Sequence, residues 1–268
     1  NKSNTRLNAT YNHRIKNRFN LQARLASHLS YVKTGGNEVT NLFFIPSIRF
    51  SYMYKNHTIN FQGEARSMEV SNSNRTGDEY RNNEYEITQG NPQLKDYMNY
   101  SATISHNWNI NKYFTGLWYA QFNLNSNYIY KTCTYDASRN FFVWKVRNSG
   151  TNWLQHYEAA IQWNILPKRL FIRVGALYNY TKVNVWKTIY HHGLYATGAI
   201  VYQHNGLRAL ASLLTAPESI DQQMGVRMYA PTNLLLKLSY NIDNWNIGIT
   251  YSNPYKAEGR ERLDLEEF

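Results

Sequence analysis

The feature that most constrains this chain is a strict alternation of apolar and polar side chains, kept up over long stretches. Successive side chains of a β-strand point to opposite faces, so this pattern predicts strands with one apolar and one polar face. One such stretch places on its apolar face Phe19, Leu21, Ala23, Leu25, Leu29 and Tyr31. The polar face of the same stretch holds Arg18, Asn20, Gln22, Arg24 and His28. Counting comparable stretches along the chain predicts about twelve strands.

The lengths of the strands and of their connections narrow the fold further. Several stretches run past ten residues, longer than globular strands usually are, and about 9 to 11 residues suffice to cross a bilayer at a tilt. Short turns are expected near Lys16, Lys55–His57, Asn111–Lys112, Pro167–Lys168, His204–Gly206 and Asp243–Asn244. Long links are expected at Lys33–Thr40, Ser71–Asp96, Lys131–Thr151, Lys187–Gly193 and Thr215–Pro231. This sorting predicts an all-β fold, an antiparallel transmembrane β-barrel with short periplasmic turns and long extracellular loops.

Composition agrees with a sheet that has one wet face. The mean hydropathy of −0.61 is that of a soluble protein, and no run approaches the roughly 18 apolar residues of a membrane helix. The apolar content leans on aromatic residues, 23 of them Tyr, with Asn, Ser and Thr between them. The alternative is a soluble two-layer β protein whose apolar faces form a core. Soluble sheets seldom keep such long alternation, and a closed barrel removes exposed edges.

Positive charge is concentrated near the start of the chain. The net charge is +11, and residues 1–37 hold seven Lys or Arg and no acid. A basic run often indicates nucleic-acid binding, but no helix or aromatic platform organises these residues, so nucleic acid is not an expected partner. The single Cys133 rules out an intramolecular disulfide.

Two segments resemble a known family. Gly90–Lys95 reads G-N-P-x-L-K and is similar to the G-N-P-x-L-K-P-E segment of TonB-dependent receptors, especially those of Bacteroidetes, with Asp96 in place of the usual Pro. The expected hairpin Leu234–Asn253, followed by Pro254 and Tyr255, resembles the N-P-F hairpin near the end of those barrels. The resemblance covers the chain from about Asn91 onward, and the four earlier strands more loosely.

The resemblance implies an outer-membrane receptor that imports a nutrient ligand such as a siderophore, glycan, peptide or cofactor. Such receptors are 22-stranded barrels plugged by an N-terminal domain, so residues 1–268 are expected to be a barrel portion, with the plug domain and the final strand or strands outside it. The implied partners are outer-membrane lipid and lipopolysaccharide, the plug, the inner-membrane TonB complex reached through the N-terminal region, and a surface lipoprotein. No cofactor of its own is implied. Half a barrel has two open edges, so we expect that the fragment does not fold alone in membranes. Its structure is expected to be a curved open sheet or a strained closure of about twelve strands.

Strand faces assign the wall residues. An Arg facing lipid at mid-bilayer costs roughly 2–4 kcal/mol, so the charged face of each strand is the wet one. The residues expected to face the lumen are Arg14, Arg24, Glu64, Gln121, Gln162 and Arg173. Three tryptophans near short turns are expected to form an interfacial aromatic girdle: Trp108, Trp163 and Trp245.

Candidate ligand contacts lie in the link Lys131–Thr151. Exposed rings there can stack on sugars or other flat ligands, and the candidates are Tyr135, Phe141, Phe142 and Trp144. The alternative is a hairpin extension that packs on its neighbours. The acidic link Ser71–Asp96 matches no calcium loop, and the adjacent His191 and His192 point to opposite sides of an extended chain. No metal site is therefore predicted.

Two other function classes remain open. A self-contained twelve-stranded passive porin would share the strand pattern. An outer-membrane enzyme of the phospholipase type would act from the outer surface, where His13 and His106 lie. A nucleophile needs its base within hydrogen-bond reach, and no cluster of Ser, Asn and His resembles that family's active site. An enzyme is therefore not expected.

Overall fold

A computed structural model of the chain describes residues 2–16, 18–34, 37–148, 150–185, 187–215, 218–221, 227–229, 232–242, 245–255 and 260–262. Within these residues twelve strands form one sheet, in the order β1-β2-β3-β4-β7-β8-β11-β12-β13-β14-β17-β18, and every neighbouring pair is antiparallel. The strands are β1 (Lys2–Ile15), β2 (Phe19–Thr34), β3 (Asn37–Tyr54), β4 (His57–Met68), β7 (Tyr97–Asn109), β8 (Phe114–Ser126), β11 (Thr151–Leu166), β12 (Leu170–Asn184), β13 (Thr188–His204), β14 (Leu207–Leu214), β17 (Thr232–Ile242) and β18 (Trp245–Tyr255). The predicted all-β, antiparallel barrel wall is confirmed.

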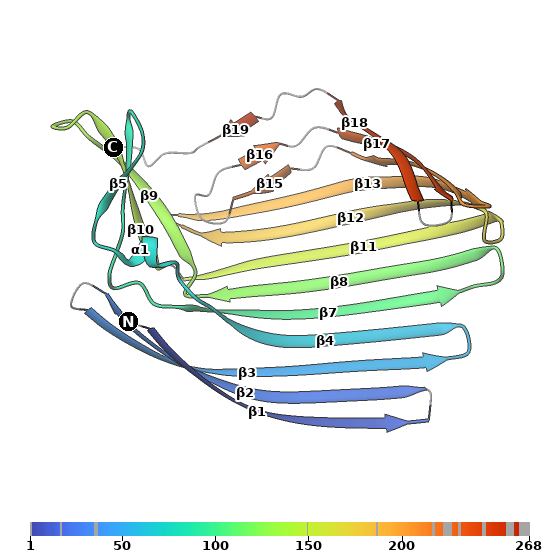
Figure 1. Cartoon of the computed structure of the whole chain (residues 1–268), viewed down its shortest axis with the longest axis horizontal. Coiled ribbons are helices and arrows are strands. Elements are labelled where there is room, and N and C mark those ends of the chain that lie inside the picture. The colour runs from blue at the N-terminus through green and yellow to red at the C-terminus, as the bar shows by residue number, and fades with distance from the viewer. Residues whose placement is uncertain are drawn as a thin grey trace.

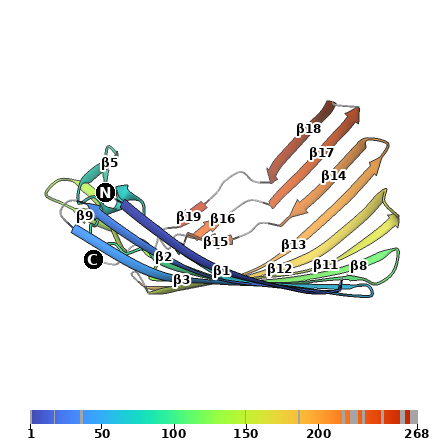
Figure 2. The ribbon, with the colours of Figure 1, turned by 60° about the horizontal axis from the view of Figure 1, so that its bottom comes forward.

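The sheet is a curved, open trough (Figures 1 and 2). Among the described strands, β1 pairs only with β2 and β18 pairs only with β17, so the two edges do not close on each other. Strand lengths of 11 to 18 residues in most of the sheet exceed the globular mode of about five to six residues. The described part of the chain holds no helix of the length and apolarity needed to cross a membrane.

The predicted short turns lie at one end of the trough, and the loops that carry additional strands lie at the other. The short turns sit at the right in Figure 1, and the loops that carry additional strands sit at the left. The turn at residues 243–244 lies outside the described residues. The turn after His204 is Asn205–Gly206, with φ of 45° and 81°, the pairing of Asn and Gly that a two-residue hairpin turn favours.

Two of the predicted long links are wrong. β2 runs to Thr34 and β3 begins at Asn37, so most of Lys33–Thr40 is strand. β12 runs to Asn184 and β13 begins at Thr188, so Lys187–Gly193 is largely strand as well. These segments continue to pair in register beyond the apolar band. They are mostly polar, so they lack the alternation of apolar and polar residues from which strands are predicted.

The other long links have structure of their own. The link after β4 holds the four-residue helix α1 (Asn72–Arg75), β5 (Glu79–Asn83) and β6 (Glu86–Gln89). The link between β8 and β11 is the hairpin of β9 (Ile129–Asp136) and β10 (Phe141–Asn148). β15 (Glu218–Ile220), β16 (Arg227–Tyr229) and β19 (Arg260–Arg262) form a small third sheet.

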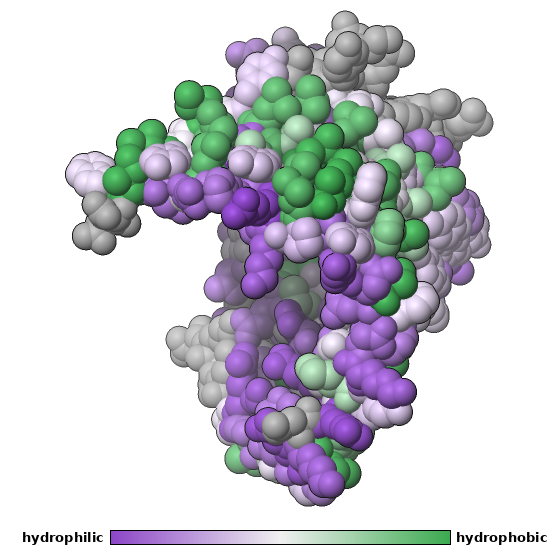
Figure 3. Space-filling view, turned by 90° about the vertical axis from the view of Figure 1, so that its right-hand side faces the viewer, coloured by the Kyte–Doolittle hydropathy of each residue, from purple (hydrophilic) through white to green (hydrophobic). Residues whose placement is uncertain are grey.

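The register gives the sheet one apolar and one polar face. Leu21, Phe50, Phe61 and Ile104 are direct partners across four strands, and the polar row beside them is Gln22, Arg49, Gln62 and Thr103. Viewed from the short-turn end, hydrophilic residues line the hollow of the trough and hydrophobic residues lie on its outer side (Figure 3). Many large apolar side chains of the outer face are exposed, among them Leu7, Val174, Leu194 and Ile249. Such a broad exposed apolar surface is what lipid contact requires.

Candidate functional site

Two loops that are distant in sequence join into one sheet above the long-loop end of the wall. Its strand order is β5-β6-β10-β9. β9 and β10 pair as an antiparallel hairpin, while β10 pairs in parallel with β6 from the preceding loop. A core of Val70, Leu94, Ile129 and Val146 lies beneath this sheet, with Tyr97 packed against it. The two loops therefore form a single packed unit, which we call the loop domain.

One face of the loop domain is aromatic. Tyr135 pairs with Phe142, and their ring centroids are 5.3 Å apart. Trp144 lies two residues further along β10 on the same face and is half-buried, while Tyr135 and Phe142 are exposed. Phe141 lies on the opposite face, with the Arg81 guanidinium 5.0 Å from its ring centroid. Three of the four aromatic candidates therefore share one face, and Phe141 lies on the other. The hairpin also packs on its neighbour β6, as the alternative interpretation expected.

An ion-pair network fixes the outer tip of the loop domain. Arg139 pairs with Glu79 across the two loops and with Asp136 in its own turn, each at 2.8 Å. Hydrogen bonds from Ser138, and then from Arg139, lower the pKa of the Asp136 carboxyl to about 2. Burial raises the pKa of the Cys133 thiol on β9, and the Glu86 carboxylate adds to the shift.

The Gly90–Lys95 segment anchors the loop domain to the wall. A Cβ at Gly90 would lie 1.9 Å from the Thr76 carbonyl oxygen, so only glycine fits there. The Asn91 side chain donates to the Val146 carbonyl at 3.2 Å, and Leu94 is fully buried in the core. The Lys95 backbone N–H donates to the Asn148 side chain at 3.0 Å. Gly90, Asn91 and Leu94 of the motif thus each have a role in one tight junction.

Asp96 is the centre of this junction, and sequence reasoning missed it. Its carboxylate forms an ion pair with Arg75 of α1, and the two side chains are only 1% and 3% exposed. It also accepts from the Val70 backbone N–H at 2.9 Å and from the Asn41 side chain at 3.3 Å. The only available signal was an acid directly before a strand, in a position where the resembling family has Pro. Nothing in the sequence pointed to Arg75.

A buried histidine lies on the polar face beside this junction. His28 of β2 is fully buried, and its Nδ1 is 2.8 Å from the Ser67 hydroxyl. Its Nε2 has no hydrogen-bond partner and lies 4.0 Å from a Glu69 carboxylate oxygen. Burial of polar wall residues at this end shows that the loop domain covers part of the polar face.

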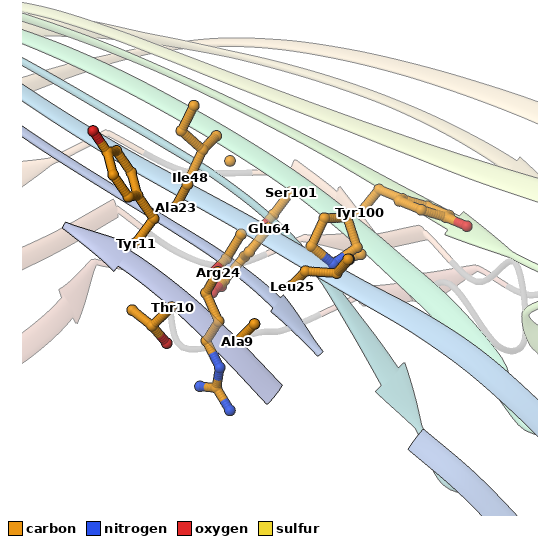
Figure 4. A pocket seen from close by; sticks show the side chains of 14 residues that line it. Ala9, Thr10, Tyr11, Ala23, Arg24, Leu25, Ile48, Glu64, Tyr100 and Ser101 are labelled. Atoms are coloured by element: carbon orange, nitrogen blue, oxygen red, sulfur yellow. The ribbon is translucent and has the colours of Figure 1, made fainter. Parts of the chain in front are cut away.

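The six residues expected to face the lumen all lie on the polar face of the sheet. Four of them contact other side chains: Glu64 pairs with Arg66, Arg173 with Glu158, Gln121 accepts from the Tyr119 hydroxyl at 2.7 Å, and Gln162 donates to Asn164 at 2.8 Å. Arg24 is exposed and reaches to the side of the sheet away from Tyr11 and Ile48 (Figure 4). Arg14 is exposed too, and its Nε donates to the Lys16 carbonyl.

The outer face carries the three expected girdle tryptophans. Trp108, Trp163 and Trp245 are all exposed and lie within a few residues of short turns. Trp163 stacks on Phe114, with ring centroids 6.1 Å apart. On the same face, small side chains of neighbouring strands leave an apolar groove of about 690 Å³ (Figure 4). Since this groove belongs to the exposed apolar surface, we assign it to the wall's lipid side.

The histidines do not assemble a metal centre in the part of the chain that the structure describes. No three His, Cys, Asp or Glu residues there are close enough to hold a metal ion. His191 Nε2 is 3.0 Å from the Glu218 carbonyl oxygen, whereas His192 contacts Tyr178 on the other face. His106 lies 3.0 Å from His57, and His13 lies beside Tyr11.

Comparison with known proteins shows similarity of fold. No family model and no curated protein matches the chain. The iron transporter FrpB of Neisseria meningitidis (F3-3 variant) superposes with a TM-score of 0.62 at 13% identity, over 94% of this chain and 40% of that one. The copper transporter OprC gives a TM-score of 0.62 at 9% identity, over 91% of this chain and 40% of that one. The chain thus spans about 40% of the length of these transporters and has the fold of their outer-membrane β-barrel wall.

Proposed function

We propose that this chain is part of the wall of a TonB-dependent receptor that imports a nutrient ligand across the bacterial outer membrane. The observation that carries the proposal is the loop domain, fixed by the Arg75–Asp96 pair above a polar trough whose outer face is apolar. The likeness to solved transporters supports the fold. The Gly90–Lys95 segment supports the Bacteroidetes type by its resemblance to the G-N-P-x-L-K segment of those receptors, and Gly90, Asn91 and the Lys95 backbone anchor the loop domain.

In this proposal the aromatic face of the loop domain makes the first contact with ligand. Tyr135 and Phe142 offer exposed rings, and Trp144 extends the same face toward the wall. Rings of this kind stack on sugars and on other flat groups. The ligand then passes along the polar face, where Arg24 and Arg49 are exposed.

The proposed partners follow from the geometry of a partial barrel. The remaining strands pair with the edges β1 and β18, the plug domain fills the trough, and the TonB complex acts on the plug. Lipid and lipopolysaccharide contact the outer face, and a surface lipoprotein meets the loop domain. A self-contained twelve-stranded pore needs β1 to pair with β18 as well as with β2, and among the described residues β1 pairs only with β2 and β18 only with β17.

Energy-dependent uptake tests the proposed class. Cells expressing the intact gene that encodes this chain are compared with and without a functional TonB complex, using candidate siderophores, glycans, peptides and cobalamin as labelled ligands. We expect at least one ligand to accumulate only when TonB is present. Accumulation that is equal in both strains would instead establish a passive pore.

Paired substitutions test the aromatic face. Changing Tyr135 and Phe142 together to Ala should raise the Kd of the imported ligand on whole cells by tenfold or more, as expected when stacking contacts of about 1 kcal/mol each are lost. Phe141→Ala is the matched control, because Phe141 lies on the opposite face beneath Arg81. Equal loss in both variants would place the binding surface elsewhere.

A further inference from the structure

The short-turn rim of the sheet is positively charged in a way that the loop end is not. Four of the turns that the structure describes carry exposed cations: Lys16, Arg18, Lys55, Lys112, Lys168 and Arg169. Those described turns contain no acidic residue, and none of the six cations forms an ion pair within the described part of the chain. Asp243 belongs to the sixth turn, which lies outside the described residues.

The backbone of these turns shows that the lysines are not default turn residues. Lys16, Lys55 and Lys168 have φ of 48°, 51° and 65°. This left-handed region favours Gly and Asn, and other residues occupy it at a cost. The other positive-φ positions of the described chain are held by Asn127, Asn140, Asn205 and Gly206. Local strain of this kind tends to occur where a side chain has a function.

Aromatic rings lie directly beside the rim cations. The Lys55 ammonium is 5.3 Å and the Arg18 guanidinium 5.9 Å from the Tyr54 ring centroid, and the Lys112 ammonium is 4.8 Å from that of Tyr113. Trp108 lies one residue before the end of β7, and Trp163 lies three residues before the end of β11, so both are deeper in the wall than the rim cations. Tyrosine and tryptophan at the depth of the headgroups, with cations just beyond them, match the layering of a phospholipid leaflet.

A cavity of about 510 Å³ also lies at the rim, between the fourth and fifth turns. Its lining includes Gln203 and Arg208, which pair with each other on the polar face of the sheet. We therefore assign this cavity to the polar side of the rim, away from the lipid.

We propose that the exposed cations of the short-turn rim bind the phosphates of anionic phospholipids. The loop end supplies its own counter-ions, through pairs such as Arg139–Glu79 and Lys33–Glu38. The rim cations have none in the described chain, and a membrane leaflet would provide them. The inference rests on the proposed membrane location and adds to it a selectivity among lipids. It does not depend on TonB-driven import.

The test uses the left-handed lysines, because Asn suits their backbone better than Lys does. The triple variant Lys16→Asn, Lys55→Asn and Lys168→Asn removes three charges without disturbing the turns. The intact protein in neutral detergent is titrated with phosphatidylglycerol and, in parallel, with phosphatidylcholine, and bound lipid is counted by native mass spectrometry. The matched control removes three charges at the loop end: Lys95→Gln, Lys131→Gln and Lys145→Gln.

We expect wild type and the loop-end control to retain phosphatidylglycerol in preference to phosphatidylcholine. The rim variant should lose this preference, with an affinity lower by roughly 100-fold if each charge contributes about fivefold. Equal retention of both lipids by wild type, or undiminished phosphatidylglycerol binding by the rim variant, would overturn the proposal. A third arm adds inorganic phosphate. Its displacement of the lipid at equal concentration would indicate a site for free phosphate, and this too would overturn the proposal.

The lipid-binding test and the test of the proposed function can fail independently of each other. Heat-modifiable migration on gels confirms that each variant is folded. TonB-dependent uptake of ligand by the wild type, combined with no lipid preference, would reject the lipid inference alone. A lipid preference combined with TonB-independent uptake would reject the transport proposal alone.

Discussion

The two ends of the wall handle charge in opposite ways. At the loop end, Arg75 and Asp96 are paired and almost fully buried, and they join a helix to the wall. At the turn end, cations such as Lys55 and Lys112 are exposed, and their described neighbours are aromatic rings. At the loop end, these charges are therefore neutralised by other residues of the chain. At the turn end, no residue of the described chain neutralises the cations. Substitutions should therefore weaken the fold at the first end and leave it nearly intact at the second.

The largest effect is expected at the buried pair. Asp96→Ala leaves the Arg75 guanidinium buried without its counter-ion, and breaking such a pair by removing one partner costs about 3–5 kcal/mol. Hydrogen exchange should become fast throughout residues 69–96, with the wall strands still protected. If exchange in this loop were unchanged, the loop domain would not depend on the pair, and the contrast between the ends would fail.

Within the wall, the effect of an added charge on assembly should depend on which face carries it. Ile161→Arg places a charge on the exposed apolar face, two residues inside the girdle residue Trp163, at a cost of up to roughly 2–4 kcal/mol, the value at mid-bilayer. The neighbouring Gln162→Arg puts the same charge on the polar face, beside Asn164. Folded protein extracted from membranes should fall sharply for the first variant and little for the second. The opposite order would exchange the two faces and remove the basis of the transport proposal.

At the turn end, stability should depend more on the backbone conformation than on the side chains. Gly206 has φ of 81°, and a Cβ there would lie 2.5 Å from the Asn241 carbonyl oxygen. Gly206→Ala should destabilise the hairpin by at least the roughly 1–2 kcal/mol of an L-residue in the left-handed region. Lys55→Asn, in the turn between β3 and β4, should change stability by less than about 0.5 kcal/mol. Urea unfolding of the two variants in lipid vesicles compares them directly.

The smallest effect is expected at the exposed tip of the loop domain. The pKa of Asp136 is lowered to about 2, so its carboxylate favours the folded tip at pH values above its ordinary pKa of about 3.9. That contribution is lost as the pH falls from about 4 to about 2. Exchange at residues 136–140 should rise over this window, and Asp136→Asn should abolish the pH dependence. A transition near pH 6 would show that another group controls the tip.

The sequence was informative where a single physical rule decides the structure. Alternation follows from strand geometry, so the twelve strands and the faces of Phe50, Ile104 and Gln162 could be derived from it. The tips of β2 and β3 could not, because pairing there continues through polar residues. Tertiary contacts are the other limit. The parallel pairing of β6 with β10 joins residues more than fifty positions apart, and the partners of Asp96 come from three separate segments.

The length of β2 and β3 has a consequence for how the protein meets the outside of the cell. β3 has 18 residues, which at about 3.3 Å per residue and a tilt near 40° rise roughly 45 Å, against an apolar band about 25 Å tall. Leu42 is still an exposed apolar residue of the outer face, whereas Lys33 and Glu38 nearer the tip form an ion pair at 2.5 Å. The described part of this hairpin therefore extends beyond the apolar band into the aqueous layer. An antibody against its outer surface would recognise paired strands, and a linear peptide of the same residues would be a poor immunogen for it.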